Sequence, residues 1–135
     1  MTTEFVLLSH GAMSEGMKQT IEMIIGKQEK LHAIGMKEEE GVGALLLQLD
    51  RILCQSDASF ILMSDLFGGS VNTAVYERYQ DEPRVSIVAG INLSLALELL
   101  LQADPCKQSI VSAIELAKHN IVSMADLNVM NADDE

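Results

Sequence analysis

Phe5-Val6-Leu7-Leu8-Ser9-His10-Gly11 is an apolar run that ends in Ser-His-Gly just before a helical pattern begins. Such a run predicts the first strand of a parallel sheet that is buried on both faces. The residue at the carboxyl end of that strand faces the loop layer in which open α/β sheets bind their ligands. Because imidazole titrates near neutral pH, His10 is a candidate nucleophile or general base. The ordinary alternative is a histidine that ends a strand and hydrogen-bonds to the backbone.

Strand and helix patterns alternate along the whole chain. Strands are expected at 4–9, 31–36, 59–64, 84–89 and, as a last short strand, 121–130; helices are expected at 14–25, 42–54, 70–79, 93–101 and 107–119. Ser14 is the expected N-cap of the first helix, and Gly26 is its expected stop. The alternation predicts one α/β domain over residues 1–130, followed by an acidic tail at 131–135. Its sheet would be doubly wound and mainly parallel, with helices on both faces.

The composition narrows the classes of partner. The chain carries a net charge of −11, has only three arginines and is 4% aromatic. This balance argues against binding to nucleic acid or to an anionic membrane surface, and a protein partner would be basic. No stretch approaches the ~20 apolar residues of a membrane span, and we expect no signal peptide. Cys54 and Cys106 lack metal-ligand spacing, so we expect both to be reduced and buried, as is usual in the cytoplasm.

A second informative segment repeats the pattern around His10. Ser64-Asp65-Leu66-Phe67-Gly68-Gly69-Ser70 follows an apolar strand and leads through two glycines into a helix. If the two strands are neighbours, Asp65 and His10 face one crevice at the switch point of the sheet. The carboxylate would accept from one ring nitrogen and leave the other with a free lone pair.

The two glycines and Ser70 in this segment have the properties of an anion-binding loop. Gly68 and Gly69 allow close backbone approach and have N–H groups that are expected to face the cavity, and Ser70 adds a hydroxyl at a helix N-terminus. The alternative is a tight turn with an N-cap serine. Together with His10 and Asp65, however, the loop predicts a phosphohistidine site.

Three stretches, residues 5–16, 65–70 and 89–93, resemble the enzyme IIA component of the mannose–fructose–sorbose phosphotransferase system. The similarity in order and spacing covers about residues 4–103. The resemblance implies a phosphoryl carrier, in which phospho-HPr donates to His10 and His10 passes the group to a IIB component for sugar uptake and phosphorylation. It implies that Asp65 orients the imidazole.

The resemblance also implies further features of the site and the assembly. The phosphate-binding loop would consist of Phe67, Gly68, Gly69 and Ser70, with no cofactor and no metal. The protein would be a cytoplasmic homodimer that exchanges its last, antiparallel strand, for which 121–130 is the candidate. It would meet the membrane only indirectly, through the sugar permease, and would bind no nucleic acid. We also expect an acidic or apolar rim around His10 that meets a basic surface of HPr.

Two residues depart from the family pattern. Val71 and Ser94 stand where family members often have proline, and loss of a helix-starting proline would soften the loop and affect the transfer rate. Three other functions share parts of the pattern. A phosphohistidine phosphatase or mutase normally has an arginine where Ser9 stands, a regulatory or dimerisation module would have the fold without transfer, and the dihydroxyacetone-kinase phosphotransfer subunit has a related fold.

Overall fold

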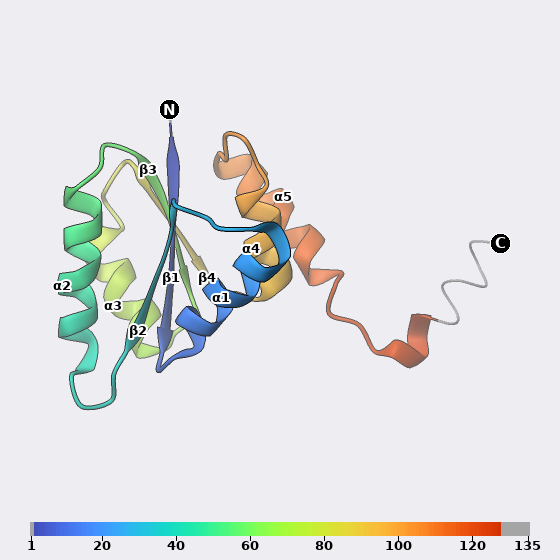
Figure 1. Ribbon diagram of the computed structural model, residues 1–135, viewed down its shortest axis with the longest axis horizontal. Helices are drawn as coiled ribbons and strands as arrows, with labels where there is room; N and C mark the ends of the chain where they lie inside the picture. The colour runs from blue at the N-terminus through green and yellow to red at the C-terminus, as the bar shows by residue number, and fades with distance from the viewer. Residues whose placement is uncertain (1, 128–135) are drawn as a thin grey trace.

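The computed structural model describes residues 2–127. The elements are β1 (Thr3–His10), α1 (Met13–Ile25), β2 (Leu31–Met36), α2 (Gly41–Cys54), β3 (Ser59–Ser64), α3 (Ser70–Tyr79), β4 (Val85–Ala89), α4 (Leu93–Leu100) and α5 (Lys107–Lys118). The strands form one parallel sheet in the order β2-β1-β3-β4 (Figure 1). The predicted α/β fold with a doubly wound parallel sheet is therefore confirmed.

The strand order creates a switch point between β1 and β3. From β1 the chain crosses through α1 to β2 on one side, whereas from β3 it crosses through α3 to β4 on the other side. Leu8 of β1 pairs with Ser64 of β3. His10 lies two residues beyond Leu8, and Asp65 lies one residue beyond Ser64, so both residues leave the sheet at the same edge. This crevice is where a doubly wound sheet binds its ligands.

Helices cover both faces of the sheet (Figure 1). On one face α2 and α3 pack against strand side chains that include Val6, Leu8 and Leu62. On the other face α1, α4 and α5 pack against side chains that include Leu7 and Met63. Successive residues of β1 therefore face opposite cores, which explains why the whole run from Phe5 to Leu8 is apolar.

The start of α1 differs from the prediction. Ser14 lies inside the first turn, and the N-cap is Ala12, whose side chain makes no capping hydrogen bond. The Ser14 N–H instead donates to the Ser9 hydroxyl at 2.8 Å, so a serine in β1 satisfies one of the first helical N–H groups. Gly26 does end the helix as predicted, with a φ of 85° that favours glycine.

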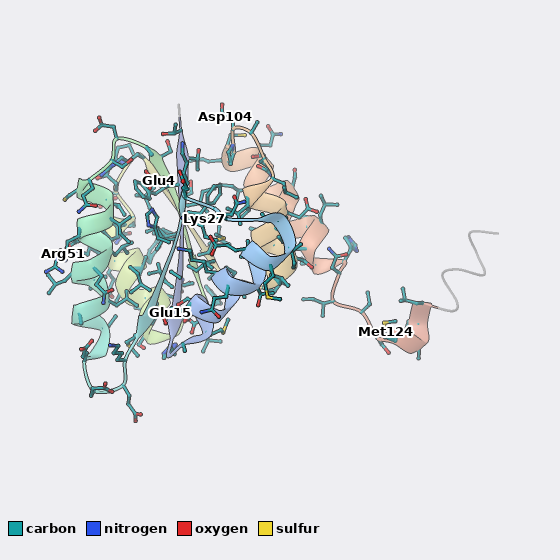
Figure 2. All side chains as sticks on the ribbon, viewed as in Figure 1. Glu4, Glu15, Lys27, Arg51, Asp104 and Met124 are labelled. Carbon is teal, nitrogen blue, oxygen red and sulfur yellow. The ribbon has the colours of Figure 1, made fainter. Side chains whose placement is uncertain are left out.

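The predicted strand at 121–130 is wrong for residues 121–127. Residues 121–123 have no regular secondary structure and 124–127 form a helical turn, with an Asp126 N–H bond to the Ser123 carbonyl at 3.0 Å. This stretch runs away from the sheet, so its backbone has no strand to pair with (Figure 1). Met124 lies far from β4 in Figure 2. Positions 128–130 of the predicted strand and the tail at 131–135 lie outside the described residues.

Both cysteines are exposed free thiols, so their predicted burial is wrong. Cys54 is the last residue of α2 and Cys106 is the N-cap of α5, and both positions lie at element ends outside the two cores. Among the helices of residues 2–127, none combines the length and the apolarity that crossing a bilayer requires.

Candidate functional site

His10 and Asp65 form a close pair at the switch point. The Nδ1 atom of His10 lies 2.8 Å from Oδ2 of Asp65, and the His10 backbone N–H donates to the same oxygen at 2.8 Å. The other carboxylate oxygen, Oδ1, accepts from the Leu66 N–H at 2.9 Å. Asp65 therefore holds both the backbone and the ring of His10, and the two predicted residues lie together as the strand order requires.

The surroundings of Asp65 favour its ionised form. Partial burial raises the pKa of the carboxyl, but the hydrogen bonds from the backbone and the ring of His10 lower the pKa below its ordinary value overall. An ionised carboxylate can only accept hydrogen bonds. Nδ1 of His10 therefore carries the proton, and Nε2 has the free lone pair.

Ser70 lies at the other side of the imidazole. Its Oγ is 3.1 Å from Nε2 of His10, so its hydroxyl donates to the lone pair in the resting protein. Ser70 is the first residue of α3, and the His10 side chain is 44% exposed. Nε2 thus lies beside a helix N-terminus on an accessible surface, with its lone pair directed toward the Ser70 hydroxyl.

The backbone N–H groups of the two loop glycines donate hydrogen bonds to acceptors within the protein. Gly68 donates to Oδ1 of Asn72 at 3.0 Å, and Gly69 donates to the Leu66 carbonyl at 3.0 Å. Neither N–H group faces the cavity, contrary to the expectation from sequence. Gly68 has a φ of 80°, which explains the need for glycine there.

Other backbone donors of the loop are free. Among the described residues, the N–H groups of Phe67, Ser70 and Val71 donate to no protein acceptor. Those of Ser70 and Val71 are free because the first turn of a helix has no preceding carbonyls to bond. These donors, rather than the glycine N–H groups, are available to an anion at the helix N-terminus. A proline at position 71 would cost no hydrogen bond within the protein, but it would remove one of these free donors.

The turn after His10 packs against β2 without space to spare. The Gly11 N–H donates to the Met36 carbonyl at 2.9 Å, and Gly11 has a φ of 58°. A Cβ on Gly35 would lie 2.0 Å from the Gly11 carbonyl oxygen. Gly35 is therefore required for the position of the turn that carries His10. Sequence reasoning missed Gly35 because this contact depends on strand pairing between β1 and β2.

Apolar and acidic side chains are exposed at the edge of the sheet that carries His10, and together they form its rim. Leu66, Phe67 and Met13 are 60%, 84% and 45% exposed, and they follow directly on the strands that carry the site. Glu15 in the first turn of α1 and the exposed glutamates at 38–40 lie at the same edge of the sheet. Figure 2 shows Glu15 at this end of the molecule and Glu4 at the opposite end.

The arginines lie away from His10. Arg78 forms an ion pair with Asp50, and Arg84 donates to the Leu53 carbonyl at 2.7 Å. Arg51 is exposed on α2 (Figure 2). The site thus lacks the arginine clamp that a phosphohistidine phosphatase or mutase uses. Within residues 2–127, no cluster of three His, Cys, Asp or Glu side chains is arranged to hold a metal ion.

Comparison with known proteins agrees with this geometry. The family described as PTS system fructose IIA component matches residues 4–118. The mannose-specific EIIAB component of the phosphotransferase system (PTS) from Escherichia coli strain K12 is 26% identical over 129 residues, which are 92% of this chain and 40% of that protein. The chain therefore spans less than half the length of this relative. The sorbose-specific EIIA component of Lacticaseibacillus casei is 29% identical over 105 residues, 75% of this chain and 74% of that one.

Solved structures share the fold. The PTS IIA protein associated with the fucose utilization operon of Streptococcus pneumoniae superposes with a TM-score of 0.84 at 23% identity, over 94% of this chain and 96% of that one. The mannose/sorbose-specific IIA subunit of Enterococcus faecalis gives 0.82 at 22% identity, over 92% and 96%. Fold and site define a doubly wound α/β protein with a histidine–carboxylate pair at its switch point. The chain belongs to the IIA family of the sugar phosphotransferase system.

Proposed function

We propose that this protein is a phosphoryl carrier that accepts a phosphoryl group on Nε2 of His10 from phospho-HPr and passes it to a histidine of a IIB component. The observation that carries the proposal is the position of the His10 ring between Asp65 and the N-terminus of α3. Asp65 holds Nδ1 as a donor, which leaves the Nε2 lone pair to attack phosphorus. The transfer would serve sugar uptake and phosphorylation.

The chemistry balances without a separate acid or base. The Nε2 lone pair of His10 forms an N–P bond as the N–P bond of the donor histidine breaks, and the donor imidazole leaves with the electron pair. Phosphoryl transfer asks a protein mainly for positioning and for stabilisation of charge on the oxygens. In the second half-reaction the His10 imidazole is itself the leaving group. Its Nδ1 stays protonated throughout and donates a hydrogen bond to the Asp65 carboxylate.

The N-terminus of α3 supplies the stabilisation of charge. The Ser70 hydroxyl lies 3.1 Å from Nε2, and the free N–H groups of Ser70 and Val71 belong to the same helix N-terminus, where they would meet the oxygens of a group on Nε2. Helix N-termini favour anions through these unpaired donors and through the helix dipole. The Ser70 hydroxyl, which donates to Nε2 in the resting protein, would turn to a phosphoryl oxygen after transfer.

The rim fits a partner with a basic and apolar surface. Phe67 and Leu66 supply exposed apolar area next to His10, and Glu15 and the glutamates at 38–40 supply negative charge. Lys37 is the basic residue of the same loop. Opposite charges on two proteins accelerate their encounter. This proposal includes a cytoplasmic location, since donor and acceptor would meet the carrier there.

A homodimer also belongs to the proposal. The free edge of β4 borders a largely apolar groove of about 560 Å³, whose lining includes Phe67, Tyr76 and Ile87. Ile121 and Met124 are 73% and 72% exposed on the segment that leaves α5. Exchange of this segment between two copies would cover the free edge of β4 and the exposed side chains of Ile121 and Met124. Sedimentation equilibrium tests the proposal: a dimer is expected, and a monomer after truncation at residue 120.

The first experiment measures intact mass after incubation with phosphoenolpyruvate, enzyme I and HPr. Wild type should gain one acid-labile phosphoryl group, and His10→Ala should gain none. The matched control is His32→Ala, because His32 pairs with Glu4 at the opposite end of the sheet. Absence of any gain in wild type, with the carriers shown to be active on a known IIA protein, would overturn the proposal and favour a regulatory module.

A further inference from the structure

Asn72 is a buried polar residue next to the site, and both ends of its carboxamide are used. It lies in the first turn of α3 and is 9% exposed. Its Oδ1 accepts from the Gly68 N–H at 3.0 Å, and its Nδ2 donates to the Ser64 hydroxyl at 2.9 Å. The orientation of the carboxamide is unambiguous, because a backbone N–H can only donate. One side chain thus ties the helix to both the loop and the end of β3.

The Ser64 contact carries this link into the sheet. Ser64 is fully buried, and its hydroxyl donates to the Val88 carbonyl of β4 at 3.4 Å. Its backbone carbonyl accepts from the N–H groups of Gly90 and Ile91. Ser64 immediately precedes Asp65, so the strand end that bears the carboxylate is held from two sides.

The Gly68 contact fixes the other half of the site. Gly68 is in the left-handed region, and its N–H has no acceptor other than Asn72 within the described chain. Loss of this acceptor would leave a donor that is free to turn toward the cavity. The loop leads directly into Ser70, whose Oγ is 3.1 Å from Nε2 of His10. The geometry at Nε2 therefore depends on how the loop is held.

We propose that Asn72 is a positioning residue for phosphoryl transfer, because it holds Asp65 and Ser70 at the two opposite nitrogens of the His10 ring. This inference rests on the proposed function. Asn72 contacts neither the ring nor the incoming group, and it acts through Ser64 and Gly68. Asn72 acts by fixing the distance between the end of β3, which carries Asp65, and the N-terminus of α3, which carries Ser70.

The test compares Asn72→Ala with a variant that is destabilised in the same helix. Val75→Ala is the control, because Val75 is fully buried one turn further along α3 and packs in the apolar core. The two variants are first compared by urea unfolding. Single-turnover phosphorylation by phospho-HPr should then be slower by roughly 10- to 100-fold in Asn72→Ala and close to wild type in Val75→Ala, because small misplacements of reacting groups cost this much.

A second measurement reads the resting site without any transfer. The ¹⁵N signals of the His10 imidazole report which nitrogen carries the proton and how each is hydrogen-bonded. Asn72→Ala should change the Nε2 signal through the displaced Ser70 hydroxyl, and Val75→Ala should leave it unchanged. If Asn72→Ala does not fold, Asn72→Asp keeps the acceptor for Gly68 and loses the donor to Ser64, and it should change the Nδ1 signal and slow transfer through the strand end that carries Asp65.

The two measurements separate the inference from the proposed function. If wild type accepts no phosphoryl group, the carrier proposal fails, while the ¹⁵N signals still show whether Asn72 positions the ring partners. If wild type is phosphorylated, wild-type rates and unchanged His10 signals in Asn72→Ala or in a folded Asn72→Asp would overturn the role of Asn72. A loss of rate that Val75→Ala shares in proportion to stability would also overturn it.

Discussion

The Gly35 backbone lies against the Gly11 carbonyl so closely that a Cβ on Gly35 would be 2.0 Å from that oxygen and 3.1 Å from the carbonyl carbon. Gly35 is in β2, and Gly11 directly follows His10. The contact shows that the position of His10 depends on a strand that has no chemical part in the site. It also explains how β2, at the edge of the sheet, constrains the residue that we propose to be phosphorylated.

Gly35→Ala should therefore slow phosphorylation of His10 by roughly tenfold or more, because the Gly11 carbonyl is backbone and can move only with its turn. The same overlap should lower the free energy of unfolding by about 1–3 kcal/mol. Gly43→Ala in α2 is the matched control, since a Cβ there would meet nothing within 4 Å. Wild-type transfer by Gly35→Ala would show that the turn moves without affecting His10.

Asp65→Asn should reduce the single-turnover rate by roughly 100-fold, because the carboxylate uses both oxygens as acceptors. Whichever way a carboxamide is turned, its NH₂ group faces an N–H donor, either on His10 or on Leu66. The imidazole then loses its fixed tautomer. The measurement is the rate of phosphorylation together with the ¹⁵N signals of the ring, and a variant that keeps the Nδ1–H tautomer and the rate would contradict the role of Asp65.

The stability of the protein should fall in acid. Hydrogen bonds from Arg78 hold the pKa of Asp50 below its ordinary value, and the net pKa of Asp65 is lowered as well. Each carboxyl binds fewer protons in the folded state than in the unfolded state, so its stabilisation is present above about pH 4 and is lost as pH falls through the lowered pKa. Urea unfolding between pH 6 and pH 3 measures this slope, which should be shallower in Asp65→Asn than in wild type.

Phe67→Ala should weaken the encounter with phospho-HPr and leave the fold intact. The ring is 84% exposed, so its removal should change the free energy of unfolding by less than about 0.5 kcal/mol. We expect a higher KM for phospho-HPr with a smaller change in the maximal rate. Met23→Ala is the control, because Met23 is 85% exposed and lies about 15 Å further along α1 than Met13. Equal effects of the two variants would exclude a docking role for Phe67.

Neutralising the glutamates at 38–40 with glutamine should slow association with phospho-HPr at low salt, and the difference should shrink as salt is added. The matched control carries the same charge change at the opposite edge of the sheet, as Glu29→Gln, Asp57→Asn and Asp104→Asn. Those three residues are also exposed. If both triple variants behave alike, overall charge rather than the rim governs the encounter.

The sequence was sufficient for the parts of the fold that depend on local pattern. The strands at 31–36 and 59–64 and the helix at 70–79 have the bounds that were predicted, because apolar runs and the Gly-Gly-Ser turn mark their ends directly. The sequence pairs His10 with Asp65 only on the condition that their strands are neighbours, and the strand order β2-β1-β3-β4 meets that condition.

Other features depend on contacts between distant residues, and local pattern does not reveal them. Gly35 and Asn72 have ordinary surroundings in the sequence, and their roles come from strand pairing and from a buried carboxamide. The sequence predicts cavity-facing N–H groups for Gly68 and Gly69 because their hydrogen bonds within the loop have no sequence signal. The segment at 121–127 has the apolar content of a strand, but a strand also needs a neighbour with which to pair.

The fixed ring of His10 limits the order in which partners can act. Asp65 holds Nδ1 and the backbone N–H, so the imidazole cannot swing between two docking sites, and only the Nε2 side is open. In the proposed cycle, donor and acceptor must both approach that one atom from the same side and therefore compete for it. The kinetics should be ping-pong, with each partner inhibiting the other when present in excess. The carrier would thus bind one partner protein at a time, and dissociation of the first partner would limit the rate at which the second can bind.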